Sequence, residues 1–284
     1  MDDRERLRIP GPVVEALACP HCGGGLRRSG GGLACARGHS FDAARQGYVN
    51  LVAGRPPTAG DDREMVRARG EFFDAGYYAP LTAKLAEHAA RWWDGGLVVD
   101  VGAGTGHHLA GVLDALPRAH GLAVDVSRYA LRRAARAHPR AGAVGGDVWR
   151  ALPLAAGSAG LLLNVFAPRN GPEFARVLRD GGTLLVVTPD ARHLAELRSA
   201  LGLIAVDPRK AERLAAQLRG RFTAAGEERV AVELSLTRAE AATLVEMTPS
   251  ARHVTAEELR SGLARMPEPV AVTAAFRLSV YRRR

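Results

Sequence analysis

Residues 97–106 read LVVDVGAGTG, a short apolar run that ends in alternating glycines, and the helical pattern HHLAGVLDAL follows at 107–116. Gly102, Gly104 and Gly106 allow positive φ angles and a close approach of the backbone to a ligand. The amino end of the following helix offers free N–H groups and a positive dipole end. A dinucleotide-binding fingerprint would have the spacing G-x-G-x-x-G, which this stretch lacks. The stretch therefore predicts a nucleotide-type site of another kind at a strand end.

Outward from this stretch, strand and helix patterns alternate at short spacing. Such alternation indicates parallel strands joined by crossover helices. We therefore expect residues 97–284 to form a doubly wound α/β domain with a mostly parallel, seven-stranded sheet. The expected strands are 97–102, 119–127, 141–147, 159–166, 182–189, 228–236 and 270–284, and the expected helices include 107–116, 128–138 and 173–180.

Acidic residues stand at three successive strand ends. Asp100 precedes the glycines, Asp125 ends the next strand, and Asp147 follows the third. Asp125 is placed to accept hydrogen bonds from two ribose hydroxyls, and Asp147 to accept one from an adenine amino group. The competing interpretation is a tight turn with surface carboxylates that cap helices. The combination of glycines and acids favours a bound nucleoside.

The cysteines form a second pattern, within an N-terminal lobe expected over residues 1–45. All three, Cys19, Cys22 and Cys35, fall in the string CPHC…CARGH, together with His39. Three thiolates and one imidazole complete a tetrahedral zinc shell, and a filled shell is structural rather than catalytic. His21 is a rival fourth ligand, but it would be crowded between Cys19 and Cys22. We therefore expect one structural zinc ion.

Residues 46–96 are expected to link the lobe to the α/β domain. Pro56, Pro57 and Gly60 mark irregular chain, and a helix capped by Asp61 or Asp62 should end near residue 76. A further helix should begin at residue 80 and reach residue 94.

Composition narrows the class of protein. The chain has 284 residues, 47% of them hydrophobic, which is an ordinary globular balance. No apolar run approaches the ~20 residues that span a bilayer, and the amino end lacks a signal-peptide core, so we expect a cytoplasmic protein without membrane contact. The formal net charge of +9 suggests an anionic partner such as nucleic acid. Codon bias in a GC-rich genome explains the preference for Arg over Lys but not the surplus of cations.

Several of these motifs resemble a known family. VVDVGAGTG resembles motif I of class I (Rossmann-like) S-adenosylmethionine-dependent methyltransferases. The CPHC…CARGH lobe, FDAARQGYVNL and GDDREMVRARGEFFDAGYYAPL resemble the RlmA-type 23S rRNA (guanine-N1)-methyltransferases, closest to the TlrB-like branch associated with tylosin-type macrolide resistance. The resemblance covers nearly the whole chain. It departs in motif I, where Ala103 and Thr105 replace residues often seen in the family.

The resemblance implies particular site residues. Its zinc ligands fall on Cys19, Cys22, Cys35 and His39. Its S-adenosylmethionine contacts fall on the glycine loop and on Tyr78, His108, Leu109 and His193.

The resemblance also implies an activity, which is methyl transfer to N1 of a guanine in a 23S rRNA hairpin near the peptide exit tunnel. It further implies a homodimer whose two zinc lobes frame an RNA cleft. The loop NVFAPRN, residues 164–170, follows the fourth strand, where a substrate base would meet the methyl group. Asn164 is expected to bond a base edge, Phe166 to stack on the base and Pro168 to hold the loop rigid. The alternative is that Phe166 belongs to the core and Asn164 caps a turn.

Two other functions compete. A small-molecule methyltransferase of antibiotic biosynthesis would carry the same motif I, but the zinc lobe and the positive charge disfavour it. A non-catalytic RNA-binding protein would retain the fold as a relic, but the intact glycine loop and the three acids disfavour that.

Overall fold

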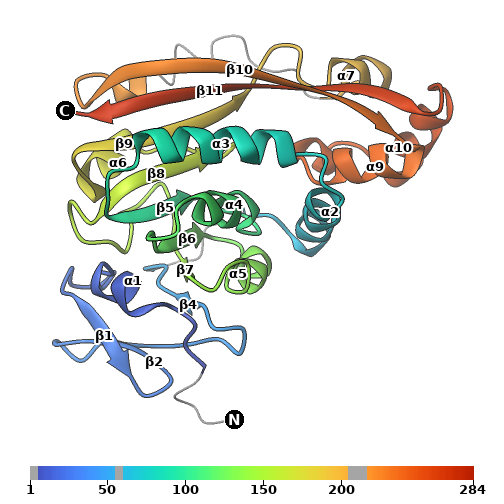
Figure 1. Cartoon of the computed structure of the whole chain (residues 1–284). Helices are drawn as coiled ribbons and strands as arrows, with labels where there is room; N and C mark the ends of the chain where they lie inside the picture. Colours follow the sequence, from blue (N-terminus) through green and yellow to red (C-terminus); the bar gives the residue numbers. More distant parts are fainter. Residues whose placement is uncertain (1–5, 55–59, 204–215) are drawn as a thin grey trace.

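The computed structural model describes residues 6–54, 60–203 and 216–284, so Pro56 and Pro57 of the expected linker lie outside the described residues. A central sheet with the strand order β10-β11-β9-β8-β5-β6-β7-β4 dominates the molecule (Figure 1). Its strands are β4 (Val49–Asn50), β5 (Leu97–Val101), β6 (Gly121–Asp125), β7 (Ala141–Gly145), β8 (Ala159–Val165), β9 (Leu178–Pro189), β10 (Phe222–Leu236) and β11 (Val270–Arg283).

The described residues of 97–284 hold seven strands of this sheet, β5 to β11, but the sheet has eight strands rather than the expected seven. The eighth strand comes from outside this range, because β4 pairs in parallel with β7 through Val49 and Val144. A two-residue strand is too short to show a hydrophobic period, so this strand could not be predicted from the sequence. The strands from β4 to β9 are parallel to their neighbours, whereas β11 is antiparallel to β9 and β10. The mostly parallel sheet is confirmed.

The helices begin where capping residues satisfy their first N–H groups. Asp62 accepts a hydrogen bond from the Met65 N–H and begins α2, while Ser127 caps α5. Thr237 and Thr255 form capping boxes at α9 and α10. The helices are α1 (Gly11–Glu15), α2 (Arg63–Asp74), α3 (Ala79–Trp92), α4 (His107–Ala115), α5 (Arg128–Ala134), α6 (Gly171–Val177), α7 (Ala195–Leu201), α9 (Arg238–Glu246), η2 (Pro249–Arg252) and α10 (Ala256–Ala264).

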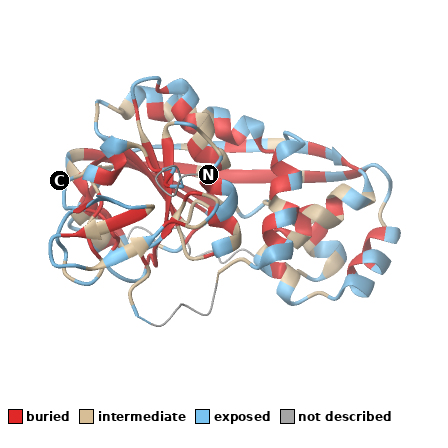
Figure 2. Cartoon of the chain, turned by 90° about the horizontal axis from the view of Figure 1, so that it is seen from below, coloured by how far each residue is buried: buried red, intermediate tan, exposed pale blue. Residues whose placement is uncertain are grey.

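The sheet is buried on both faces, as a parallel sheet requires. Along β5, Val98 packs with α3 and α4, and Val99 packs with α6 and the N-terminal segment. Figure 2 shows buried residues along the strands and exposed residues on the outward faces of the helices. Within the described residues, no helix combines the length and apolar character needed to cross a bilayer.

The N-terminal lobe is a small antiparallel sheet of β1 (Leu26–Ser29), β2 (Gly32–Cys35) and β3 (Ser40–Asp42). The lobe packs directly onto the larger domain. The Ala18 N–H donates to the Pro153 carbonyl at 3.1 Å, and Ile9 is fully buried against Gly142. The lobe and one face of the sheet share a hydrophobic core. The expected domain boundary after residue 45 stays a prediction.

Candidate functional site

A cavity of about 730 Å³ lies at the carboxyl ends of β5, β6, β7 and β8. Ligands of open α/β sheets bind at this edge. Segments far from the sheet in sequence close the cavity. They are the second half of α2 with Arg69 and Phe73, and the end of α9 with Val245 and Met247. The cavity size lies within the range of about 300–1,000 Å³ that is usual for small-molecule sites.

The three glycines of the loop serve different purposes. All have left-handed backbone, with φ of 78° at Gly102, 56° at Gly104 and 81° at Gly106. A Cβ at Gly102 would lie 2.3 Å from the Cβ of Ala167, and one at Gly106 would lie 3.0 Å from the Cβ of Ala137. Gly106 does not line the cavity, so it serves helix packing rather than ligand contact. Gly104 does line it, and its N–H donates to Asp125 Oδ2 at 2.8 Å.

All three strand-end acids line the cavity. Asp100 is only 2% exposed, and its Oδ1 has no hydrogen-bond partner in the described part of the chain. Burial, and then the charge of Asp125, raises the pKa of Asp100 to about 8. Burial raises the pKa of Asp125 to about 6, against the opposing effect of N–H groups from Ser127 and Gly104. The surface-cap interpretation is wrong, because Asp100 and Asp147 are buried and Ser127 caps α5.

The stability of the cofactor-free protein should fall with rising pH because of Asp100. Between its ordinary pKa of 3.8 and its folded pKa of about 8, the folded state retains a proton that the unfolded state has lost. This linkage lowers the free energy of unfolding by about 1.4 kcal/mol per pH unit. Asp100→Asn removes it, so the variant's melting temperature should exceed that of the wild type increasingly from pH 5 to 8. Thermal unfolding without cofactor measures this, and a difference that does not change with pH would contradict it.

The aromatic and imidazole side chains expected at the site are mostly present. Tyr78 lines the cavity, and burial raises its pKa above the ordinary value. His108 also lines it, with Nδ1 2.8 Å from Thr82 Oγ1 and a buried Nε2 that has no hydrogen-bond partner among the described residues. Burial, and then the nearby His107 and Arg69, lowers the pKa of His108 to about 3, so the ring is neutral at pH 7. Leu109 does not line the cavity but packs in the core, 1% exposed.

Of the three residues in the loop after β8 that were expected to meet the substrate base, two line the cavity and one does not. Phe166 and Pro168 line the cavity, as does His193, whose ring stacks on Phe166 with centroids 6.2 Å apart. Asn164 is fully buried and does not line the cavity. Its Nδ2 donates to the Pro168 carbonyl at 2.9 Å and to the Val101 carbonyl at 3.3 Å. The amide therefore supports the loop in this structure instead of facing a base edge, as the turn interpretation expected.

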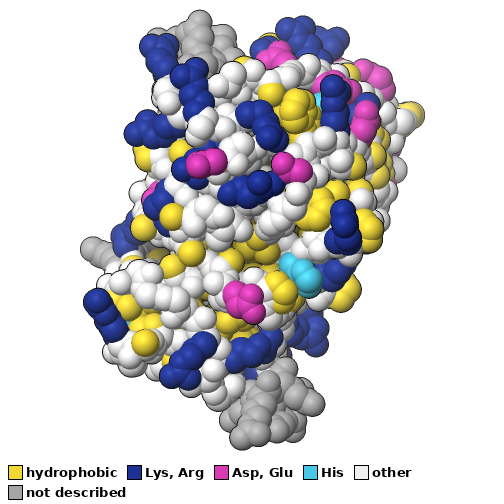
Figure 3. Space-filling view, turned by 60° about the vertical axis from the view of Figure 1, so that its left-hand side comes forward, with side chains coloured by type: hydrophobic (Ala, Val, Ile, Leu, Met, Phe, Trp, Pro, Cys, Tyr) yellow, Lys and Arg dark blue, Asp and Glu magenta, His cyan; other side chains and the backbone are white. Residues whose placement is uncertain are grey.

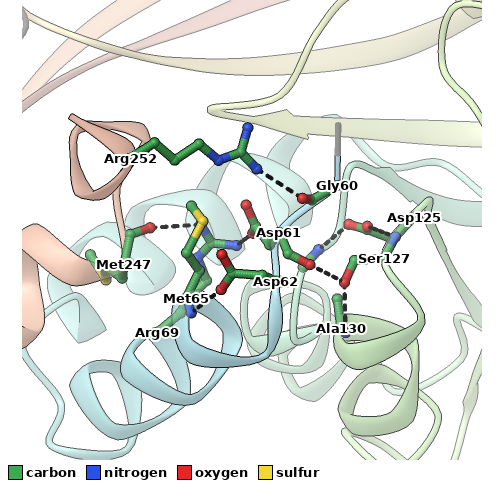
Figure 4. Close-up of polar contacts among 11 residues, drawn as sticks. Gly60, Asp61, Asp62, Met65, Arg69, Asp125, Ser127, Ala130, Met247 and Arg252 are labelled. Atoms are coloured by element: carbon green, nitrogen blue, oxygen red, sulfur yellow. Dashed lines mark hydrogen bonds and ion pairs between the residues drawn. The ribbon is translucent and has the colours of Figure 1, made fainter. Parts of the chain in front are cut away.

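Sequence reasoning missed the group that closes the cavity from α2. Arg69 pairs with Asp61 and donates to the Met247 carbonyl at 2.9 Å (Figure 4). The Ser127 hydroxyl donates to the Asp61 carbonyl at 2.6 Å, and Arg252 donates to the Gly60 carbonyl at 2.9 Å. These contacts join three distant segments. Nothing in the local pattern of α2 distinguishes Arg69 from a surface arginine.

The four expected zinc ligands lie together in the lobe. The ligand atoms of Cys19, Cys22, Cys35 and His39 are all within 4.8 Å of one another. Cys22 and Cys35 Sγ are 3.8 Å apart, close to the ~3.7 Å edge of a tetrahedron with Zn–S bonds of about 2.3 Å. Although burial opposes it, hydrogen bonds from Arg37 and His39 lower the pKa of the Cys35 thiol to about 6. His21 is not in the cluster and stacks on Phe41.

The donor set of the cavity fits S-adenosylmethionine. Its cationic ammonium group matches the buried carboxyl group of Asp100, its ribose matches the acceptor Asp125, and its adenine amino group matches the acceptor Asp147. Two buried atoms, Asp100 Oδ1 and His108 Nε2, have no hydrogen-bond partner among the described residues, and both residues line the same cavity. Polar groups of a ligand would supply these missing partners.

Comparisons with known proteins agree with this fit. The family model described as "RlmA, N-terminal" matches residues 17–53, and the model described as "Methyltransferase domain" matches residues 98–182. A 23S rRNA (guanine(748)-N(1))-methyltransferase of Streptomyces fradiae is 50% identical, over 95% of this chain and 98% of its own length. A protein of Micromonospora griseorubida, provisionally assigned to guanine-N1 methylation of 23S rRNA, is 54% identical over the same shares. The structure of the YcgJ protein of Bacillus subtilis has a TM-score of 0.49 at 14% identity, over 72% of this chain and 97% of that one.

Proposed function

This chain belongs to the family of RlmA-type 23S rRNA (guanine-N1)-methyltransferases, and from this we propose that it methylates N1 of a guanine in a 23S rRNA hairpin. The observation that carries the proposal is the relationship to guanine-N1 methyltransferases over 95% of the chain. The cavity with its glycine turn and three acids supports it. The name of the Streptomyces fradiae relative specifies guanine 748, and we propose the same position here.

We assign the cofactor contacts as follows. Asp125 accepts from the ribose hydroxyls, Asp147 from the adenine amino group, and Asp100 pairs with the ammonium group. Gly104 lets the backbone approach, while Tyr78, His108 and His193 form the surrounding wall. The buried positions Gly106 and Leu109 act through packing.

The chemistry requires positioning more than acid–base groups. S-adenosylmethionine supplies an activated methyl group, so the protein's task is to bring guanine N1 into line with it. N1 lies on the Watson–Crick edge and is hidden in a paired stem, so the target guanine must be unpaired or flipped. Phe166 offers it a stacking surface beside the cavity, and Pro168 stiffens the loop that carries this ring.

The zinc lobe and the charge of the protein support an RNA substrate. Lys and Arg side chains are spread over the whole face shown in Figure 3, with Asp and Glu side chains at fewer places among them. We propose that the lobe contacts RNA, that two copies of the chain frame the hairpin, and that the enzyme works in the cytoplasm. Methylation near the peptide exit tunnel would confer resistance to tylosin-type macrolides.

RNA affinity should depend steeply on salt. Three or four neutralised phosphates would weaken binding about 40- to 150-fold between 50 and 200 mM salt. Titration of a labelled hairpin by fluorescence anisotropy measures this. Cofactor affinity provides the control, because it involves no phosphate and should stay nearly constant. A salt-independent hairpin affinity would count against a phosphate-contacting surface.

The decisive test of the function uses undermethylated 23S rRNA. Incubation with radiolabelled cofactor should label one guanine, and reverse transcriptase should stop one nucleotide before it, because N1 methylation blocks base pairing. A hairpin with adenine in its place should not be labelled. If the rRNA gains no stop while a macrolide precursor is methylated, the small-molecule function is correct. Hairpin binding without any methyl transfer would indicate a non-catalytic RNA-binding protein.

A further inference from the structure

Two large apolar side chains are strongly exposed within the described ranges, and both border the same cavity. Trp149 is 63% exposed and Phe166 is 40% exposed. Trp149 follows β7 and Phe166 follows β8, so both rings come from the ligand-bearing edge of the sheet, although β5 and β6 lie between their strands. Exposed aromatic rings beside a cavity offer flat faces on which a nucleobase can stack.

The structure holds the backbone that carries Trp149 and the ring of Phe166 in place. The backbone N–H of Trp149 donates to Asp147 Oδ1 at 3.0 Å, and Asn170 Nδ2 donates to the backbone carbonyl of Val148 at 2.9 Å. The second bond ties the turn that carries Trp149 to the loop that carries Phe166. Phe166 has a left-handed backbone, with φ of 54°, and its ring packs against Phe276 with centroids 5.5 Å apart. A bulky residue in this strained region is typical of functional positions.

Arg169 lies in the same loop and lines the same cavity. Among the described residues, its buried Nε has no hydrogen-bond partner and no carboxylate forms an ion pair with its guanidinium. Burial lowers the pKa of Arg169 below its ordinary value. A half-buried cation that has no hydrogen-bond acceptor among the described residues favours a ligand that brings oxygen acceptors, and guanine O6 and N7 are the acceptors that arginine recognises best.

We propose that Trp149, Phe166 and Arg169 form the receptor for the target guanine, with the base stacked on the aromatic rings and Arg169 donating to O6. This inference rests on the proposed guanine-N1 methyl transfer. Adenine carries an amino group in place of O6. Two hydrogen-bond donors, this amino group and the Arg169 guanidinium, would then face each other. Arg169 would thereby select guanine.

The same contact would activate the nucleophile. The N1 proton leaves to bulk water, and the negative charge that remains spreads onto O6, where the guanidinium stabilises it. The N1 lone pair then forms the bond to the methyl carbon, and the electrons of the broken S–C bond remain on sulfur. The 164–170 loop contains no carboxylate or imidazole, so the charge that this loop itself offers the base is the cation of Arg169.

The test of Arg169 is a pH profile. Arg169→Gln should lower kcat about 100-fold at pH 7, as loss of one oxyanion-type donor does, with cofactor affinity unchanged in calorimetry. The defect should shrink as the pH rises, because N1 then ionises unaided, and Arg169→Lys should recover part of the rate. Asp100 and Asp125 are present in all of these proteins, so the ratio of wild-type to variant rates cancels their titration. Tyr281 lies near Arg169 and keeps its proton below pH 10, because burial raises its pKa above the ordinary value of 10. Arg118→Gln, an exposed arginine before β6, is the matched control and should behave as wild type.

The test of Trp149 uses its fluorescence. The chain has three tryptophans, so Trp92→Phe combined with Trp93→Phe leaves Trp149 as the sole indole. The hairpin should quench its emission, and a hairpin with an abasic target position should quench it much less. Trp149→Ala should raise KM for the hairpin roughly 5- to 150-fold, whereas Trp93→Phe should not.

The outcomes separate this inference from the proposed function. If wild-type protein methylates the hairpin and Trp149→Ala and Arg169→Gln do so equally well, the receptor is wrong and the function stands. An Arg169→Gln defect of equal size at every pH would overturn the role at O6. If wild-type protein modifies no rRNA guanine, the proposed function fails first, whatever the variants do.

Discussion

Gly104→Val is expected to eliminate cofactor binding. Gly104 has φ of 56°, and a Cβ there would point into the cavity, with Arg69 Nη1 as its nearest neighbour at 3.3 Å. A branched side chain in left-handed backbone costs roughly 1–2 kcal/mol, and here it would also occupy the approach of the ligand. The N–H that donates to Asp125 would shift with it. Calorimetry with S-adenosylmethionine should show an affinity loss of more than about 100-fold, which is about 2.7 kcal/mol.

A matched variant separates backbone strain from blockage of the site. Gly157 has φ of 66° in a turn before β8, and a Cβ there would meet nothing closer than Arg179 Cα at 3.9 Å. Gly157→Val should therefore suffer the same strain and a similar loss of melting temperature while retaining the cofactor. Equal cofactor affinities in the two variants would mean that the cofactor binds elsewhere.

Cys22→Ser should release the zinc ion and unfold the lobe. Structural zinc supplies folding free energy directly, and a tetrahedral shell that loses one thiolate binds the metal far more weakly. The wild type should carry about one zinc per chain and the variant almost none. Because the lobe shares a core with one face of the sheet, the melting temperature of the whole chain should fall as well. Hairpin affinity should collapse with the lobe.

Cofactor affinity should nevertheless survive in Cys22→Ser, because no residue of the described lobe lines the cavity. His21→Ala is the control, since His21 lies beside the cluster but outside it, and it should keep its zinc. Zinc content by atomic absorption and hairpin binding by anisotropy measure both variants. Normal hairpin affinity in metal-free Cys22→Ser would show that the lobe does not read RNA.

Features that depend on short stretches of chain were predictable. The glycine turn with Asp100, the later acids Asp125 and Asp147, and the Cys19–His39 cluster all follow from spacing, because strand ends and metal knuckles place near neighbours by local geometry. The alternation of strands and helices likewise indicated the sheet. Asn164 and Leu109 were expected at the site but are buried elsewhere, because the side to which a residue points depends on what packs beside it.

The sequence by itself determined the α/β class, the glycine and acid site, the zinc ligands and the family to which the chain belongs. Each is set by contacts within a few tens of residues or by a repeated period. Only the tertiary structure decided that β4 joins the sheet, that Arg69 closes the cavity against Asp61 and Met247, and that Trp149 and Arg169 border it with Phe166. These arrangements bring together segments that share no local pattern, and their positions are set by burial of the common core and by hydrogen bonds between loops.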